Sequence, residues 1–125
     1  MQVLVDSSVW IDYFRTGNDS DKLDFFIDHN IVCVNDLILA ELIPFLKIAK
    51  QTKLVKLLNE VEKVPLNIDW GKIIELQTTC LKKGINKVGL PDLMIVDNVI
   101  QHNLTLYSFD KHFRLINKFT IFSMV

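Results

Sequence analysis

The sequence has little of what marks secreted, membrane-spanning or strongly basic proteins. Its 125 residues include only two cysteines, four glycines and three prolines, and its formal net charge is −1. Cys33 and Cys80 lie far apart, among apolar neighbours and at no metal-binding spacing, which is typical of buried, reduced thiols. No basic leader precedes the first apolar residues, and the most apolar stretch (37–45) contains Glu41 and is far shorter than the ~20 residues of a membrane span. We therefore expect a cytoplasmic protein with no membrane partner.

The sequence also has no large excess of positive or negative residues, but the near-zero net charge hides a difference between the two ends of the chain. Residues 1–36 carry seven acids and two bases, whereas residues 37–125 carry eight acids and twelve bases. Proteins that hold nucleic acid through its phosphates usually show a basic excess, so the total speaks weakly against such a partner. The basic surplus of the longer part leaves that partner open.

No internal repeat, low-complexity segment or linker rich in Gly, Pro or Ser divides the chain. Half of the residues are apolar and 23% are charged, which excludes a disordered tail and a fibre. The length suits one compact domain. We predict a single domain over residues 1–125.

Four short apolar runs predict the strands of a sheet. They are Val3–Val5, Ile31–Val34, Leu104–Tyr107 and Phe119–Phe122. Each is too short for a stable helix, and each is continuously apolar rather than alternating, which favours strands buried on both faces in a parallel sheet.

The stretches between these runs predict six helices. They extend from a cap at Ser7 or Ser8 to Phe14, over Asp19–Asp28, from an N-cap at Asp36, from Lys53, from Trp70 to Gly84, and from Pro91. Pro44 lies beyond the first turn of the third helix and removes a backbone hydrogen bond, so we expect a kink or an end there. The last helix is apolar around most of its circumference and should be central. Strands alternating with helices predict an α/β fold, a three-layer α/β/α sandwich with a short, mostly parallel sheet.

Acid-bearing residues directly follow three of the predicted strands. Asp6 follows the first, Asp36 follows the second with Glu41 one turn into the next helix, and Asp110 follows the third. The carboxyl ends of parallel strands share one edge of the sheet. Asp6, Glu41 and Asp110 are therefore expected at that edge, where Asp92 can join them from the start of the last helix.

Such a group of carboxylates needs a positive partner. Two carboxylates ~4 Å apart repel by about 4 kcal/mol at an effective dielectric constant of ~20. No lysine or arginine adjoins Asp6, Glu41 or Asp92 in the sequence. Mg²⁺ and Mn²⁺ accept all-oxygen ligands, and the hydroxyls of Ser8 and Ser108 can orient the carboxylates. An interpretation without metal stays open, since Asp6 can be only a helix cap and Asp92 can only complement a helix dipole.

Glu41 differs from the other acids because apolar residues flank it on both sides. An acid in such a setting is rarely buried without a partner. Glu41 therefore needs a partner if its helix buries it.

Four short motifs carry a resemblance to a known family. They are Val5–Phe14 around Asp6, Leu39–Leu42 around Glu41, Leu90–Ile95 around Asp92 and Leu106–Phe113 around Asp110. In this order and spacing, they resemble the PIN-domain proteins of the VapC toxin type, small metal-dependent ribonucleases of bacterial and archaeal toxin–antitoxin pairs. Each motif is weak alone, but the ordered set spans the whole chain and is fairly specific.

The resemblance implies an endoribonuclease that hydrolyses RNA phosphodiester bonds. The catalytic and metal-ligating acids would be Asp6, Glu41, Asp92 and Asp110, holding one or two Mg²⁺ or Mn²⁺ ions. Ser8 and Ser108 would support them. Either Asp110 or Glu41 would accept a proton. Besides RNA, the implied partners are a cognate antitoxin and a second copy of the chain in a homodimer.

Two positions depart from the family pattern. Pro44 and Phe45 stand where a small residue often follows the second acid. Asp97 also replaces a commonly small residue, and it lies about 140° around the helix from Asp92. We therefore expect Asp97 to support the site or to lie at the surface rather than to bind metal directly. The three histidines have no ligand spacing, and His112 is expected at the surface.

Basic residues suggest where RNA would bind. Lysines recur every three residues at 47, 50, 53 and 56, which is usually only a solvated helix face but can form a phosphate track. The residues considered for RNA contact are Arg15, Lys47, Lys50, Lys111 and Arg114.

Two other functions remain open at this point. A receiver-like signalling module also gathers acids and Mg²⁺ at strand ends, but it needs a phosphorylatable aspartate on a central strand and a lysine ending a late strand. A PIN fold that only binds RNA or protein is the other, although the acids are intact.

Overall fold

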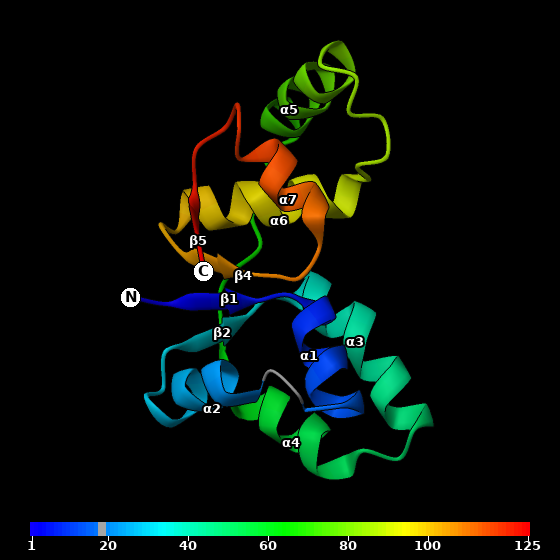
Figure 1. The fold of residues 1–125 in the computed structure, drawn as a ribbon, viewed down its shortest axis with the longest axis vertical. Coiled ribbons are helices and arrows are strands. Elements are labelled where there is room, and N and C mark those ends of the chain that lie inside the picture. The colour runs from blue at the N-terminus through cyan, green and yellow to red at the C-terminus, as the bar shows by residue number, and fades with distance from the viewer. Residues whose placement is uncertain (18–19) are drawn as a thin grey trace.

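The computed structural model describes residues 1–17 and 20–125, and through its middle runs a five-stranded sheet (Figure 1). The strands are β1 (Val3–Val5), β2 (Val32–Val34), β3 (Glu62–Lys63), β4 (Thr105–Tyr107) and β5 (Ser123–Met124). Their order is β3-β2-β1-β4-β5, and every neighbouring pair is parallel. The segments that come after β1, β2 and β4 therefore leave the sheet at the same edge.

In the described part of the chain, seven helices cover the two faces of the sheet. They are α1 (Ser7–Arg15), α2 (Ser20–Asp28), α3 (Asp36–Ile48), α4 (Thr52–Glu60), α5 (Trp70–Lys82), α6 (Leu90–Gln101) and α7 (Lys111–Ile116). Helices α1–α4 lie on one face, and α5–α7 lie on the other (Figure 1). The predicted three-layer α/β/α sandwich is confirmed. Asp19, the predicted first residue of the second helix, lies outside the described residues.

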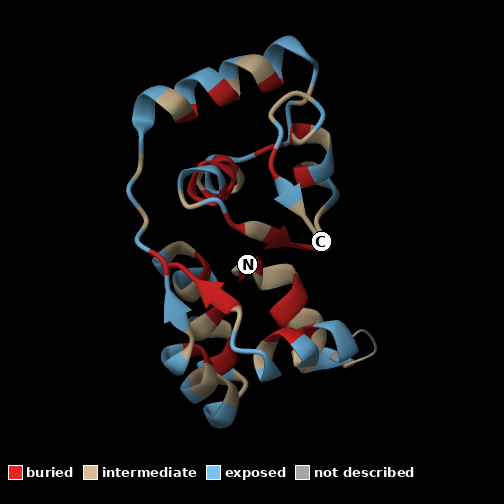
Figure 2. Cartoon of the chain, turned by 90° about the vertical axis from the view of Figure 1, so that its left-hand side faces the viewer, coloured by how far each residue is buried: buried red, intermediate tan, exposed pale blue. Residues whose placement is uncertain are grey.

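The central strands are buried on both sides, as their continuous apolar runs predict. Leu4 of β1 and Leu106 of β4 pack into a core with α5–α7, whereas Val3 and Val5 pack into a second core with α1–α4. Figure 2 shows the buried residues on these strands and on the inward faces of the helices. Central α6 contributes buried side chains from Leu93 to Val99. The sheet is therefore a rigid platform for the acid-bearing segments at the ends of its strands.

The two edge strands differ from expectation. The predicted strand Phe119–Phe122 is wrong, because β5 begins at Ser123. Phe119 instead donates its backbone N–H to the carbonyl of Ile116 in the turn after α7. Phe122 packs its side chain into the core without belonging to a strand. Strand β3 was not predicted, since its two residues are charged and exposed. An edge strand of this length leaves no apolar pattern in the sequence.

The helix ends show which capping predictions hold. Helix α3 does not end at Pro44, which lies inside it. Its N-cap is Asn35 rather than Asp36, because the Asn35 Oδ1 accepts the Ile38 N–H at 2.9 Å. Asp6, not Ser7 or Ser8, occupies the N-cap position of α1. Gly84 ends α5 as predicted, with a φ of 74° that favours glycine.

Both cysteines are buried and free of disulfide bonds. Burial, followed by the negative charge of Glu62, raises the pKa of Cys33 to about 12, so this thiol stays protonated. No helix among the described residues is long and apolar enough to cross a membrane.

Candidate metal centre

Asp6 is the buried anchor of the acidic site. It comes directly after β1, and its backbone N–H donates to the carbonyl of Tyr107 on the neighbouring β4 at 2.9 Å. Its side chain makes no capping hydrogen bond to α1. Instead, its Oδ2 accepts hydrogen bonds from the hydroxyls of Ser8 and Ser108, each at 2.8 Å. The carboxylate is thus fixed by two hydroxyls rather than used as a helix cap.

The same hydroxyls connect Asp6 to the loop after β4. Ser8 Oγ accepts the backbone N–H of Phe109, and Ser108 Oγ accepts that of Asp110, both at 3.0 Å. The two Oγ atoms lie 3.3 Å apart. This network joins the ends of β1 and β4 and sets the position at which Asp110 begins α7.

Asp110 and Asp92 form the second part of the site, and a histidine joins them. Asp110 is the N-cap of α7, and its Oδ1 accepts the backbone N–H of His112 at 2.9 Å. The ring Nδ1 of His112 lies 3.1 Å from the same oxygen. Asp92, Asp110 and His112 each offer one potential metal-ligand atom, and these three atoms lie within 4.8 Å of one another. His112, expected at the surface, is partly buried, and its ring lies beside the two acids.

Glu41 and Asp92 complete the cluster, as their electrostatics show. Partial burial of the Glu41 carboxyl, followed by the negative charges of Asp6 and Asp92, raises its pKa. Burial, then the charge of Asp110 and more weakly that of Asp6, raises the pKa of Asp92. The Gly89 backbone N–H and His112 lower the pKa of Asp92 in part. Each acid thus lies within the electrostatic reach of at least one other.

Glu41 is more accessible to solvent than its apolar neighbours in the sequence suggest. The residue as a whole is exposed, although its carboxyl group is partly screened from water. Its apolar neighbours lie on other faces of α3, because consecutive residues of a helix point about 100° apart. The apolar neighbours in the sequence therefore do not bury Glu41.

The four acids have no lysine or arginine partner among the described residues. The ion pairs there are Lys63 with Asp36 and His112 with Asp110. Neighbouring carboxylates without a cationic side chain beside them are suited to a divalent metal ion. The carboxylate oxygens of the four acids are the kind of ligand that suits Mg²⁺ or Mn²⁺.

The other predicted site residues lie around this centre or away from it. Asp97 is buried, and its Oδ2 accepts a 2.7 Å hydrogen bond from Gln101; its charged neighbours are Asp69 and Lys72. It therefore faces α5 rather than the other acids, and the alternative surface location is excluded by its 5% exposure.

The basic residues considered for RNA contact fall on separate surfaces. Arg15 ends α1, with its guanidinium 5.6 Å from the centre of the Phe45 ring. Lys47 and Lys50 line a cleft of about 210 Å³ at the junction of α3 and α4. Lys111 lines another of about 380 Å³, together with His112 and with Lys87, which sequence reasoning did not select.

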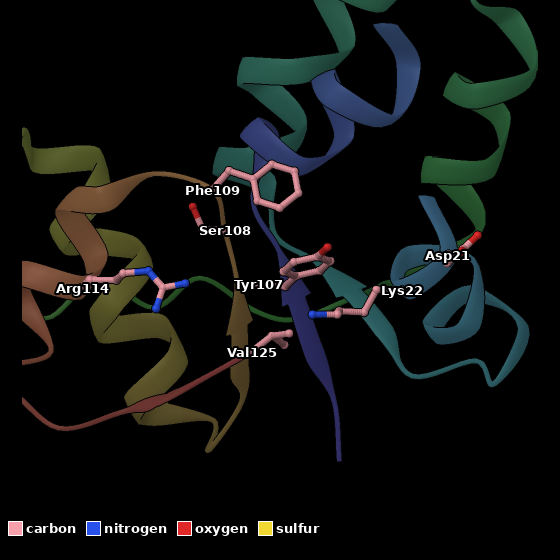
Figure 3. A pocket seen from close by; sticks show the side chains of 7 residues that line it. All are labelled: Asp21, Lys22, Tyr107, Ser108, Phe109, Arg114 and Val125. Atoms are coloured by element: carbon pink, nitrogen blue, oxygen red, sulfur yellow. The ribbon is translucent and has the colours of Figure 1, made fainter. Parts of the chain in front are cut away.

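A cavity of about 360 Å³ lies beside the acidic site, between α2, β4 and α7 (Figure 3). Arg114 lines it, as do Lys22 and Phe109, which sequence reasoning did not single out. Lys22 comes from a helix with no motif, so only the fold brings it here. The signal for Phe109 was its position between Ser108 and Asp110.

Comparisons with known proteins agree with this architecture. A family model described as PIN domain matches residues 3–118. The fold resembles VapBC2 from Rickettsia felis, solved bound to a DNA fragment from its promoter, with a TM-score of 0.79, 21% identity and coverage of 100% of this chain and 98% of that one. It also resembles VapBC-1 from nontypeable Haemophilus influenzae (TM-score 0.74, 17% identity, 100% and 97% coverage). DNA-bound VapBC from Salmonella typhimurium is similar too (TM-score 0.70, 16% identity, 100% and 97% coverage). Among curated proteins, none matches the chain.

Proposed function

Because the chain belongs to the PIN domain family, we propose that it is a Mg²⁺- or Mn²⁺-dependent endoribonuclease and the toxin of a toxin–antitoxin pair. One observation carries the proposal. Asp6, Glu41, Asp92 and Asp110 come from four separate segments, share one electrostatic cluster and have no lysine or arginine partner among the described residues. A protein gains nothing in stability from such an arrangement, so a bound cation explains it best.

The four acids would hold one or two divalent ions. When bound, such an ion lowers the pKa of a coordinated water and stabilises the charge on the leaving oxygen of the RNA. Asp6 is prepared for this role, because both hydroxyl partners bond its Oδ2 and its Oδ1 has no hydrogen bond from any described residue. Ser8 and Ser108 act as positioning residues that hold this carboxylate.

Glu41 is the better of the two candidates for accepting a proton from the attacking water. The Asp110 Oδ1 already accepts the backbone N–H of His112, and the ring Nδ1 of His112 lies 3.1 Å from the same oxygen. The Glu41 carboxyl receives no hydrogen bond from the described residues, and its raised pKa moves it toward the range of an effective base.

The substrate and partners are inferred from the family and from the charge. Two divalent ions would convert the formal net charge of −1 into a positive one, which favours RNA. Arg15, Lys47, Lys50, Lys111 and Arg114 lie on separate surfaces and would contact phosphates at different points along the RNA. Three structural relatives were solved as VapBC pairs, which supports a cognate antitoxin, and we expect a homodimer that acts in the cytoplasm.

The test is cleavage of a labelled single-stranded RNA by the purified protein. We expect cleavage with Mg²⁺ or Mn²⁺, none with EDTA, and none with the Asp92→Asn variant purified in the same way. Equal cleavage by Asp92→Asn and the unchanged protein would reveal a contaminating nuclease and overturn the site. The receiver-like alternative lacks its lysine, because Ser108 comes directly after β4; labelling of the protein by a small phosphodonor would revive it.

A further inference from the structure

The cavity beside the acidic site has two cationic side chains facing each other. In Figure 3, the Lys22 ammonium and the Arg114 guanidinium extend toward one another across a floor formed by Tyr107 and Val125. Arg114 forms no ion pair within the described residues, and the Lys22 Nζ lies 5.9 Å from the centre of the Tyr107 ring. The one acidic side chain in the lining, that of Asp21, is exposed and points away from the space between the cations (Figure 3). The cavity therefore favours an anion.

Its upper rim is an aromatic side chain that faces solvent. Phe109 is 46% exposed, and its ring meets Tyr107 edge to face, with centroids 5.5 Å apart and an interplanar angle of 87°. Tyr107 in turn meets Phe26 in the same manner at 5.8 Å. These two edge-to-face contacts hold the Phe109 ring in place and leave part of its surface accessible to solvent. Exposed, pre-positioned aromatic rings beside cations are typical of surfaces on which nucleic-acid bases stack.

The segment after β4 lines the cavity and also contacts the acidic site. Ser108 lines it and donates its hydroxyl to Asp6, while the Phe109 N–H donates to Ser8. Arg114 lies one turn of α7 beyond Asp110, about 6 Å along the helix axis. A strand with one phosphodiester at the acids can therefore place an adjoining nucleotide in the cavity.

We propose that this cavity binds one nucleotide of single-stranded RNA next to the bond that is cleaved, with its base on Phe109 and its phosphate between Lys22 and Arg114. The volume of about 360 Å³ lies at the lower end of small-molecule sites, about 300–1,000 Å³, which suits one nucleotide. The RNA must be single-stranded at this point, because a paired base cannot leave its stack to reach Phe109. The inference rests on the proposed function, since it takes RNA as the substrate.

The experiment measures binding separately from cleavage. A fluorescent single-stranded RNA is titrated into the Asp92→Asn protein at several salt concentrations, and the affinity is followed by anisotropy. Phe109→Ala should weaken binding about tenfold without changing the salt dependence, and Phe109→Tyr should restore it. Lys22→Ala and Arg114→Ala should each weaken binding and reduce the slope of log affinity against log salt by about 0.7. Lys82→Ala, which removes an exposed lysine of α5 outside the cavity, should change neither quantity.

Several outcomes would overturn the assignment. Unchanged affinity in all three cavity variants would show that RNA binds elsewhere. If Lys22→Ala and Arg114→Ala weaken binding of an acidic peptide but not of RNA, the cations serve a protein partner. If duplex RNA binds as tightly as single-stranded RNA, and Phe109→Ala weakens both equally, base stacking on Phe109 would be excluded. The cleavage assay with the unchanged protein separates the two proposals: RNA binding in the cavity without any cleavage would refute the nuclease and leave the cavity only as a binding site for single-stranded RNA.

Discussion

The Ser108 hydroxyl donates a 2.8 Å hydrogen bond to Oδ2 of Asp6, and this bond connects the ends of β4 and β1. Ser108 Oγ also accepts the backbone N–H of Asp110. One side chain therefore sets the orientation of one acid and the starting point of the helix that carries another. Hydrogen bonds to a charged acceptor are among the stronger ones in proteins. The geometry of the acidic site should depend strongly on this serine.

Replacing Ser108 tests that dependence. In Ser108→Ala, Asp6 keeps only its bond from Ser8 and the Asp110 N–H loses its acceptor, so we expect RNA cleavage to fall about 10–100-fold. The free energy of unfolding should fall by about 1–3 kcal/mol, which leaves the protein folded by circular dichroism. Ser7→Ala is the matched control, because no described side chain hydrogen-bonds to the Ser7 hydroxyl. An equal loss of cleavage in both variants would mean that the effect is not specific to Asp6.

Asp92 offers a test in which activity and stability change in opposite directions. Asp92→Asn removes a charge that is repelled by Asp110 and Asp6, so the metal-free variant should unfold a few degrees higher than the unchanged protein while losing cleavage. Differential scanning calorimetry in EDTA measures the first effect, and the RNA assay measures the second.

The matched control for this pair of effects is Asp36→Asn. Asp36 is an exposed acid 3.1 Å from Lys63, so its replacement should leave cleavage unchanged and lower stability by at most about 1 kcal/mol. A lower melting temperature for metal-free Asp92→Asn would show that this carboxylate is stabilised by the fold rather than strained by its neighbours.

Metal binding should be measurable without any substrate. An ion that binds only the folded state adds about 2.7 kcal/mol at a concentration of 100 times its dissociation constant. Mg²⁺ or Mn²⁺ should therefore raise the melting temperature by several degrees, and Asp92→Asn should lose most of that increase. A shift of equal size in this variant would place the bound ion away from the acidic site.

The meeting of acid-bearing segments at one edge of the sheet was predictable, because it depends on local sequence and parallel topology. Continuous apolar runs indicated β1, β2 and β4, and the acids at the ends of parallel strands must meet at one edge. The position of His112 beside Asp110 was not predicted because it comes from a cap: its backbone N–H bonds to Asp110, and the ring lies near the same oxygen. Nothing in the spacing of the histidines carries that information.

The parts that were not predicted depend on contacts between distant segments. Lys22 reaches the cavity only because α2 packs beside β4, and its sequence neighbours form no motif. Strand β3 pairs with β2 through two exposed charged residues, so backbone hydrogen bonding alone defines it. Phe119 and Phe122 resembled a strand because they pack against the core, which an apolar pattern cannot distinguish from a buried strand.

Asp97 gives a final test, which separates a structural acid from the acidic site. Burial raises its pKa above the ordinary aspartate value, and the charge of Asp69 adds to this effect, against opposing hydrogen bonds and Lys72. Because the folded pKa is the higher one, folding disfavours the charged form. The resulting loss of stability is absent below the unfolded pKa of about 3.9 and complete above the folded pKa.

Asp97→Asn removes this loss and keeps one side-chain oxygen, which can accept the hydrogen bond from Gln101 or that from the Asp69 backbone N–H. We therefore expect the variant to be more stable than the unchanged protein at neutral pH, with a difference that shrinks as the pH falls toward 4. Urea unfolding between about pH 4 and pH 8 measures the difference, and cleavage of RNA should remain unchanged. Cleavage that falls as far as it does in Asp92→Asn would mean that Asp97 contributes to the acidic site after all.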